Sequence, residues 1–244
     1  MKTSWTRRLS LLALWLGISA ILVALTGLVL ARYDLVPKIA GLYAMIGGAL
    51  IAFAGVFAGL TGGVLNFGHK AHYGRAALIG LVLSASYAGY IVSRAGAARA
   101  VPAIHDITTS LANPPAFHHL TLRPDNLAGV ETLQNWRAAH AKAYGDLKPL
   151  ILARPVAQVL ADAERLARQN RWTNITVDQI AGQMEATASV SFIRYKDDIV
   201  LRAVPTTDGH GSVVDMRSVS RIGVSDFGVN AKRIRAFLAA LQKS

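Results

Sequence analysis

Residues 9–31 of this 244-residue chain read LSLLALWLGISAILVALTGLVLA, and this stretch decides the fold class because it contains no charged side chain. Two further uncharged runs follow at residues 39–66 and 76–93. A helix needs about 20 apolar residues, within a range of about 17–25, to cross the hydrocarbon core of a bilayer. The three runs therefore predict three transmembrane helices, and residues 1–100 are expected to form a transmembrane region.

The first run has basic residues before it, as a cleaved secretory signal also does. A signal peptide, however, has an apolar core of about 7–15 residues and then a small-residue cleavage site. The run at residues 9–31 is longer, and no clean A-x-A site follows it. It is therefore expected to remain as an uncleaved anchor.

The net charge of +12 is concentrated around these apolar runs. Residues 1–100 contain nine Lys or Arg residues and one Asp, whereas residues 101–244 contain 17 Lys or Arg and 13 Asp or Glu. Five cations before the first span or between the second and third share one side of the membrane: Lys2, Arg7, Arg8, Lys70 and Arg75. Cations favour the cytoplasmic side. The bias, which Arg94 and Arg99 weaken, predicts an inner (plasma) membrane protein with a cytoplasmic N-terminus and a periplasmic C-terminal domain.

Small residues recur at a spacing of four within the predicted spans. Gly55, Gly59 and Gly63 form a GxxxGxxxG ridge, and such ridges let helices approach closely in lipid. The ridge is expected to pack against other helices of the same chain, or against a second copy in a homo-oligomer. No Asp, Glu, Lys or Arg lies within a span, which argues against a transport pathway.

Residues 101–244 are long enough for one soluble domain, in which helices are expected around an antiparallel sheet. The expected helices cover about residues 127–143, 156–170 and 230–242, with Asn230 as the last N-cap. The expected strands cover about residues 172–177, 188–195, 199–204 and 213–221, with a turn at Lys196–Asp198. The predicted fold class is a membrane-anchored chain: three transmembrane α-helices, then a soluble α+β domain with an antiparallel sheet and a C-terminal helix.

Several short motifs occur together in the second half of the chain. They are Ile104-His-Asp-Ile-Thr-Thr109, Asn113-Pro-Pro-Ala-Phe117, Glu185-Ala-Thr-Ala188, Lys196-Asp-Asp-Ile-Val-Leu-Arg202, Val214-Asp-Met-Arg-Ser218 and Ser220-Arg-Ile-Gly-Val-Ser-Asp-Phe-Gly-Val-Asn230. With this combination, residues 103–242 resemble the uncharacterised bacterial and plastid family called domain of unknown function 1499. The resemblance implies the domain boundary and a membrane-associated or envelope setting, and it implies no catalytic residue.

The loop before the C-terminal helix is one candidate for ligand binding. It contains Arg221, Ser225, Asp226 and Asn230, together with two glycines. The free N–H groups at a helix N-terminus favour a carboxylate or phosphate ligand. The same polar side chains could instead satisfy those N–H groups themselves.

Charged positions on the predicted strands are a second candidate. Arg202 lies on one strand, and Asp215, Arg217 and Arg221 share a face of the next. Arg202 could pair with Asp215 across the two strands, since opposite charges on neighbouring strands are mildly stabilising. Alternatively, these side chains could line a concave surface that holds a small molecule.

His105 and Asp106 are the remaining candidates for a polar site. The histidines do not have the spacing of a zinc site, and no cysteine is available as a metal ligand or nucleophile. The chain also lacks a G-x-S-x-G elbow, a phosphate-binding loop and a dinucleotide fingerprint. No cofactor and no nucleic-acid partner is therefore expected.

The leading hypothesis is a non-enzymatic envelope protein that the lipid bilayer anchors. Its C-terminal domain would bind a small molecule, a lipid or a protein partner outside the cytoplasm. The alternative is a hydrolase that acts on an envelope substrate through His105, Asp106 or Asp226. Geometry can distinguish the two hypotheses. A catalytic site would require His105 and Asp106 to lie in one cleft with the loop of Ser225–Asn230.

Overall fold

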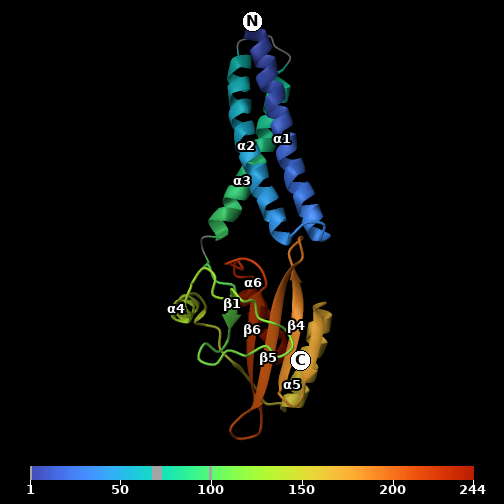
Figure 1. Cartoon of the computed structure of the whole chain (residues 1–244), viewed down its shortest axis with the longest axis vertical. Helices are drawn as coiled ribbons and strands as arrows, with labels where there is room; N and C mark the ends of the chain where they lie inside the picture. The colour runs from blue at the N-terminus through green and yellow to red at the C-terminus, as the bar shows by residue number, and fades with distance from the viewer. Residues whose placement is uncertain (1, 68–72, 99–100) are drawn as a thin grey trace. The chain divides into compact units, whose positions relative to one another are not determined.

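The computed structural model describes residues 2–67, 73–98 and 101–244 (Figure 1). The chain divides into two compact units, residues 1–100 and residues 101–244. Two cations that enter the expected charge bias, Lys70 and Arg99, lie outside the described residues.

Three long helices form the N-terminal unit: α1 (Lys2–Arg32), α2 (Lys38–Asn66) and α3 (Gly74–Ala98). Their most apolar windows have mean hydropathies of 2.4, 2.0 and 1.7, and all three helices are long and apolar enough to cross a membrane. The three helices expected from the uncharged runs are therefore confirmed. Their length and composition indicate a membrane protein.

Small residues bring these helices close together. In α2, Gly55 faces Ser84 of α3, and Gly59 faces Leu81 of α3. A Cβ atom at Gly55 would lie 2.2 Å from the Ser84 Oγ, so a larger residue there would require the Ser84 side chain to move. A Cβ atom added at Gly63 would have no neighbour within 4 Å. Two members of the ridge thus pack within the chain, and the homo-oligomer stays a prediction.

The C-terminal unit is built on a six-stranded antiparallel sheet. Its strands are β1 (Asp106–Thr108), β2 (Leu150–Leu152), β3 (Thr173–Asp178), β4 (Gln183–Val190), β5 (Tyr195–Pro205) and β6 (Ser212–Ser220). The order is β1-β6-β5-β4-β3, and β2 also pairs with β6. β1 and β2 lie along the edge of β6 that β5 does not use, opposite residues 217–219 and 212–214. The predicted antiparallel sheet is therefore confirmed, with two short edge strands added.

One face of the sheet is apolar and carries the core. Met184, Leu201 and Met216 point into it and are fully buried. Two helices cover this face (Figure 1): α5 (Val156–Gln169) contacts β3, β4 and β5, and α6 (Val229–Lys243) contacts β6, β1 and β2. A third helix, α4 (Leu133–Tyr144), adds Trp136 to the same core. Since side chains alternate along a strand, the opposite face receives the intervening polar residues.

Two local predictions differ from the structure. The strand expected at residues 188–195 lies instead at Gln183–Val190, and the chain turns at Ser191–Arg194. Lys196–Asp198, the expected turn, belongs to β5, where Asp197 and Asp198 are buried and paired with arginines. Helix α4 begins six residues later than expected, at Leu133. The backbone before it is left-handed at Gly129 and Glu131, with φ angles of 91° and 66°, and this conformation cannot continue a helix.

Candidate functional site

The polar face of the sheet is covered by residues 113–125, a segment without helix or strand that we call the covering segment. Strand side chains bind its backbone carbonyl groups. Arg202 donates to the Asn113 carbonyl oxygen at 2.9 Å, and Gln183 donates to that of Ala116 at 2.8 Å. The Pro115 carbonyl oxygen likewise accepts from Arg217, at 3.1 Å.

Glu185 of β4 holds the middle of the covering segment. Its carboxylate accepts hydrogen bonds from three consecutive backbone N–H groups, those of His118, His119 and Leu120, at 2.5–3.1 Å. Gln183 donates a further bond at 3.0 Å. Glu185 is 1% exposed, so its carboxylate has lost its hydrogen bonds to water. The four protein donors replace those bonds. A loop backbone that resembles an anion site is therefore filled by the protein's own carboxylate.

Three Arg–Asp pairs cross the same face. Arg202 and Asp215 are cross-strand partners, 2.8 Å apart, so the predicted pairing is confirmed. Two further pairs join Arg217 to Asp106 and Arg221 to Asp198, at 2.6 Å and 2.8 Å. The structure thus brings Asp106, Arg202, Arg217 and Arg221 onto one face, where each carboxylate or guanidinium has a partner from the protein.

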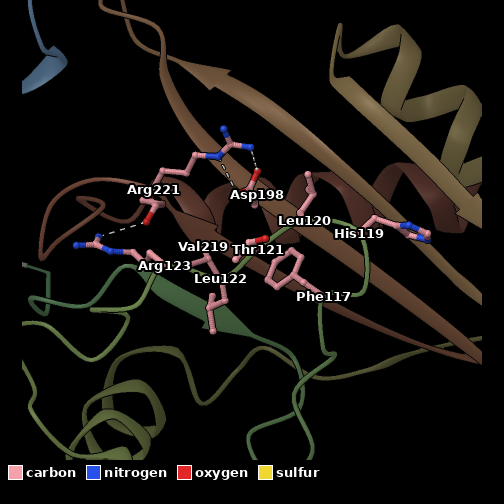
Figure 2. A pocket seen from close by; sticks show the side chains of 10 residues that line it. Phe117, His119, Leu120, Thr121, Leu122, Arg123, Asp198, Val219 and Arg221 are labelled. Carbon is pink, nitrogen blue, oxygen red and sulfur yellow. Dashed lines mark hydrogen bonds and ion pairs between the residues drawn. The ribbon is translucent and has the colours of Figure 1, made fainter.

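A pocket of about 460 Å³ opens where the covering segment passes the ends of β5 and β6 (Figure 2). It is lined by Phe117, His119, Leu120, Thr121, Leu122, Arg123, Asp198, Val219, Ser220 and Arg221. Its volume lies within the range of about 300–1,000 Å³ that is usual for ligand sites. Figure 2 shows His119 pointing away from the two arginines, so the cationic end of the pocket belongs to Arg123 and Arg221.

The two arginines of this pocket differ in their freedom. Arg123 is engaged by the Gly223 carbonyl oxygen at 2.7 Å and by the Asp125 carboxylate at 2.6 Å, and Arg123 lowers the pKa of Asp125 to about 2. Arg221 uses Nε and Nη2 for Asp198, which raises the pKa of the guanidinium. Nη1 of Arg221 makes no hydrogen bond within the described residues, and the side chain is 43% exposed. Arg221 can therefore donate to a ligand without giving up Asp198.

The loop before α6 serves the helix itself. The Asp226 carboxylate accepts from the backbone N–H groups of Gly228 and Asn230, at 3.0 Å and 2.5 Å. Burial raises the pKa of Asp226, while these two bonds oppose that shift. The expected N-cap at Asn230 is therefore wrong: Gly228 occupies that position, and Asn230 lies inside the first turn. Ser225 is also used locally, since its Oγ accepts from the Phe227 N–H at 3.2 Å.

His105 and Asn230 meet inside the domain, because the Asn230 side chain donates to the His105 carbonyl oxygen at 2.8 Å. The His105 side chain is 2% exposed, and among the described residues neither ring nitrogen reaches hydrogen-bond geometry with its polar neighbours, the Val224 backbone and the Asn126 side chain. Burial and the nearby Arg123 charge lower the pKa of His105, which favours the neutral form of the ring. His105, Asp106, Asp226 and Asn230 line neither of the two pockets described here.

The central residue of the polar face, Glu185, was missed by the sequence reasoning. A charge amid the strand pattern, at the head of the Glu185-Ala-Thr-Ala188 motif, was the available signal. Arg123 and Phe117 were also missed, since nothing in the sequence places residues 113–125 over the sheet. Within the described part of the chain, no group of three or more His, Asp or Glu residues could hold a metal ion.

Comparison of the chain with known proteins finds one family model, described as a protein of unknown function (DUF1499), over residues 106–241. No curated protein and no solved structure matches the chain. The matched residues include every strand of the sheet, the covering segment and nearly all of α6. Because the match covers more than half of the chain, the protein belongs to the DUF1499 family.

Proposed function

We propose that this protein is a membrane-anchored binding protein whose C-terminal domain takes up a small anionic molecule beside Arg221. The pocket between the covering segment and the sheet carries this proposal. Phe117, Leu120 and Leu122 supply apolar contact, and Arg221 offers a free guanidinium nitrogen that can bind a carboxylate or phosphate. Apolar side chains combined with polar groups that fix the orientation of a ligand are typical of small-molecule sites.

Binding is favoured over catalysis by the roles of the three residues that the hydrolase hypothesis would need. Asp106 is held by two nitrogens of Arg217, and Asp226 accepts from the first N–H groups of α6. His105 is buried at 2% exposure. A general acid or base must reach the substrate, whereas these groups are committed to the fold.

A pocket-filling variant tests the binding proposal. Thr121 lines the pocket, is exposed and makes no hydrogen bond within the described residues, so Thr121→Trp fills the space without removing a structural bond. Native mass spectrometry of the full chain released from detergent should show a bound small molecule that Thr121→Trp loses. The matched control is Thr207→Trp, in an exposed turn away from both pockets. An empty wild-type chain, or a molecule retained by Thr121→Trp, would contradict the proposal.

We further propose that the binding domain lies in the periplasm and that the N-terminus lies in the cytoplasm, in the inner membrane. Lys2, Arg7 and Arg8 at the N-terminal end of α1, together with Lys70 and Arg75 between the second and third apolar runs, support this orientation. Reporter fusions at the C-terminus provide the test. A C-terminal reporter that is active only outside the cytoplasm should show activity. Activity of a reporter that functions only in the cytoplasm would refute the orientation.

A further inference from the structure

A second pocket lies on the helical side of the domain, where the end of α5, the β4–β5 turn and α6 meet. It encloses about 670 Å³ and is lined by Asn170, Arg171, Trp172, Ala188, Ser189, Val190, Ser191, Arg194, Arg233, Ala236, Phe237 and Ala240. Three of these residues are arginines, and none is Asp or Glu. It shares no lining residue with the pocket beside Arg221. The electrostatics of this second pocket therefore favour an anion.

The three arginines have different roles in the fold. Arg233 is fixed, because it pairs with Asp197 at 2.6 Å and donates to the Ser218 hydroxyl at 2.8 Å. Arg171 and Arg194 are exposed, and the side chain of neither forms a hydrogen bond or ion pair within the described residues. Two uncompensated cations beside a third repel one another, and a doubly charged oxyanion would offset that repulsion.

The backbone under the two free arginines is unfavourable for arginine. Arg171 has a φ of 57° and Arg194 a φ of 62°, in the left-handed region where side chains are disfavoured. Arg171 follows the end of α5, and the Trp172 N–H bonds back to the Ala167 carbonyl oxygen at 3.0 Å. This pattern is a Schellman motif, in which glycine usually occupies the position of Arg171. An arginine at this position is therefore not explained by the stability of the helix end.

The other wall of the pocket is apolar and aromatic. The rings of Trp172 and Phe237 are stacked, with centroids 4.7 Å apart and an angle of 17° between their planes. Ala188 of β4 and Ala236 and Ala240 of α6 continue this wall. A ligand here can therefore place an oxyanion against the arginines and an apolar or planar group against the rings.

We propose that this pocket binds a phosphate group that is attached to an apolar or planar moiety. Planar guanidinium groups bind phosphate through paired, charge-assisted hydrogen bonds, which a single lysine-type charge does not provide. A soluble phosphate monoester and a phospholipid headgroup share this chemistry. The proposal is independent of the pocket beside Arg221, because the two sites use different residues.

The test measures binding of phenyl phosphate to the full chain in phosphatidylcholine nanodiscs by calorimetry. The test variant is Arg171→Gly combined with Arg194→Gly, which removes both free charges and places glycine where the backbone favours it. Its control is Arg137→Gln, which removes an exposed cation of α4 that lines neither pocket. Thermal unfolding of each variant is measured alongside binding.

Wild type should bind phenyl phosphate about tenfold more tightly than inorganic phosphate, since only the former contacts the rings. The double variant should weaken the binding of phenyl phosphate about 30-fold or more, with an unfolding temperature no lower than that of wild type. Arg137→Gln should bind as wild type does. Absence of phenyl phosphate binding to wild type, or unchanged binding in the stable double variant, would overturn the proposal. Thr121→Trp fills the pocket beside Arg221 and should leave phenyl phosphate binding at the second pocket unchanged. The two proposals can therefore fail separately.

A second arm distinguishes the two sources of phosphate. Phosphatidic acid is added to the nanodiscs, and oleate nanodiscs of equal charge serve as the control. If the natural ligand is a phospholipid, phosphatidic acid should compete with phenyl phosphate. The apparent affinity for phenyl phosphate should then be lower than in the oleate control. Unchanged affinity would support a soluble phosphate ester as the ligand of the same site.

Discussion

The two faces of the sheet are both covered, but by different means. The helical face is closed by α5 and α6 through apolar side chains such as Leu201 and Met216. The opposite face is closed by residues 113–125, whose backbone N–H groups donate to Glu185 and whose carbonyl oxygens accept from Arg202 and Arg217. Apolar packing has no direction, whereas a buried carboxylate requires donors at defined positions. The charged face therefore fixes where each residue of the covering segment lies.

This difference bears on how charged strand positions are interpreted. A row of Arg and Asp on one sheet face suggests a ligand surface when it is read along the sequence. Here most of these groups bind backbone atoms of the same chain or each other, and one guanidinium nitrogen of Arg221 is left for a ligand. A candidate site is therefore better located by unused donors than by the presence of charge.

Leu201→Ala should produce the largest loss of stability, because Leu201 is fully buried in the helical face. Removing such a side chain costs about 2–5 kcal/mol through lost burial and the cavity that remains. Hydrogen exchange of the full chain should show residues 101–244 losing protection together. Selective loss in residues 113–125 would contradict the separation of the two faces.

Glu185→Leu should cost about 2–3 kcal/mol, because three backbone N–H groups lose a charged acceptor. Its effect should be local, with hydrogen exchange rising most in the covering segment. Glu185→Gln keeps one acceptor oxygen and is expected to show a smaller rise. If the covering segment stays protected in Glu185→Leu, the carboxylate does not hold it.

His105→Leu should have the smallest effect and the opposite sign. The two ring nitrogens are buried, and neither reaches hydrogen-bond geometry with its polar neighbours, the Val224 backbone and the Asn126 side chain, so an apolar side chain should raise the free energy of unfolding by about 1 kcal/mol at pH 7. Urea unfolding followed by a short proteolysis pulse on the full chain measures this change.

The same variant should also change the pH dependence of stability. Burial lowers the pKa of His105 and of His140, so the folded state binds fewer protons than the unfolded chain. Stability is therefore present above the unfolded histidine pKa of about 6.5 and is lost as the pH falls below it. His105→Leu should remove its share of this loss and leave that of His140. A wild-type slope that is unchanged in the variant would show that His105 does not titrate as proposed.

Local patterns predicted much of the architecture. Uncharged runs identified α1, α2 and α3, and alternation identified β5 and β6 within a few residues. Arg202 and Asp215 were paired correctly because the register of a hairpin follows from its strands.

The polar site was not predictable in the same way. Alternation assigns Glu185 to a face but does not say which segment covers that face. The partners of Glu185 are 65–67 residues away in sequence, within a stretch that has no helical or strand periodicity. The β4–β5 turn was misplaced for a related reason: Asp197 and Asp198 resemble turn residues until Arg233 and Arg221 are known to pair with them.

The position of β1 has a consequence for how the domain folds. Strands β3 to β6 pair with their neighbours in sequence, and those contacts can form as soon as each strand is made. β1 pairs instead with β6, where Asp106 lies opposite Val219, more than a hundred residues later in the chain. Closing so long a loop is slow, and contacts of this kind lower folding rates. Asp106 and its neighbours can therefore pair only after a strand more than a hundred residues further along the chain has been made.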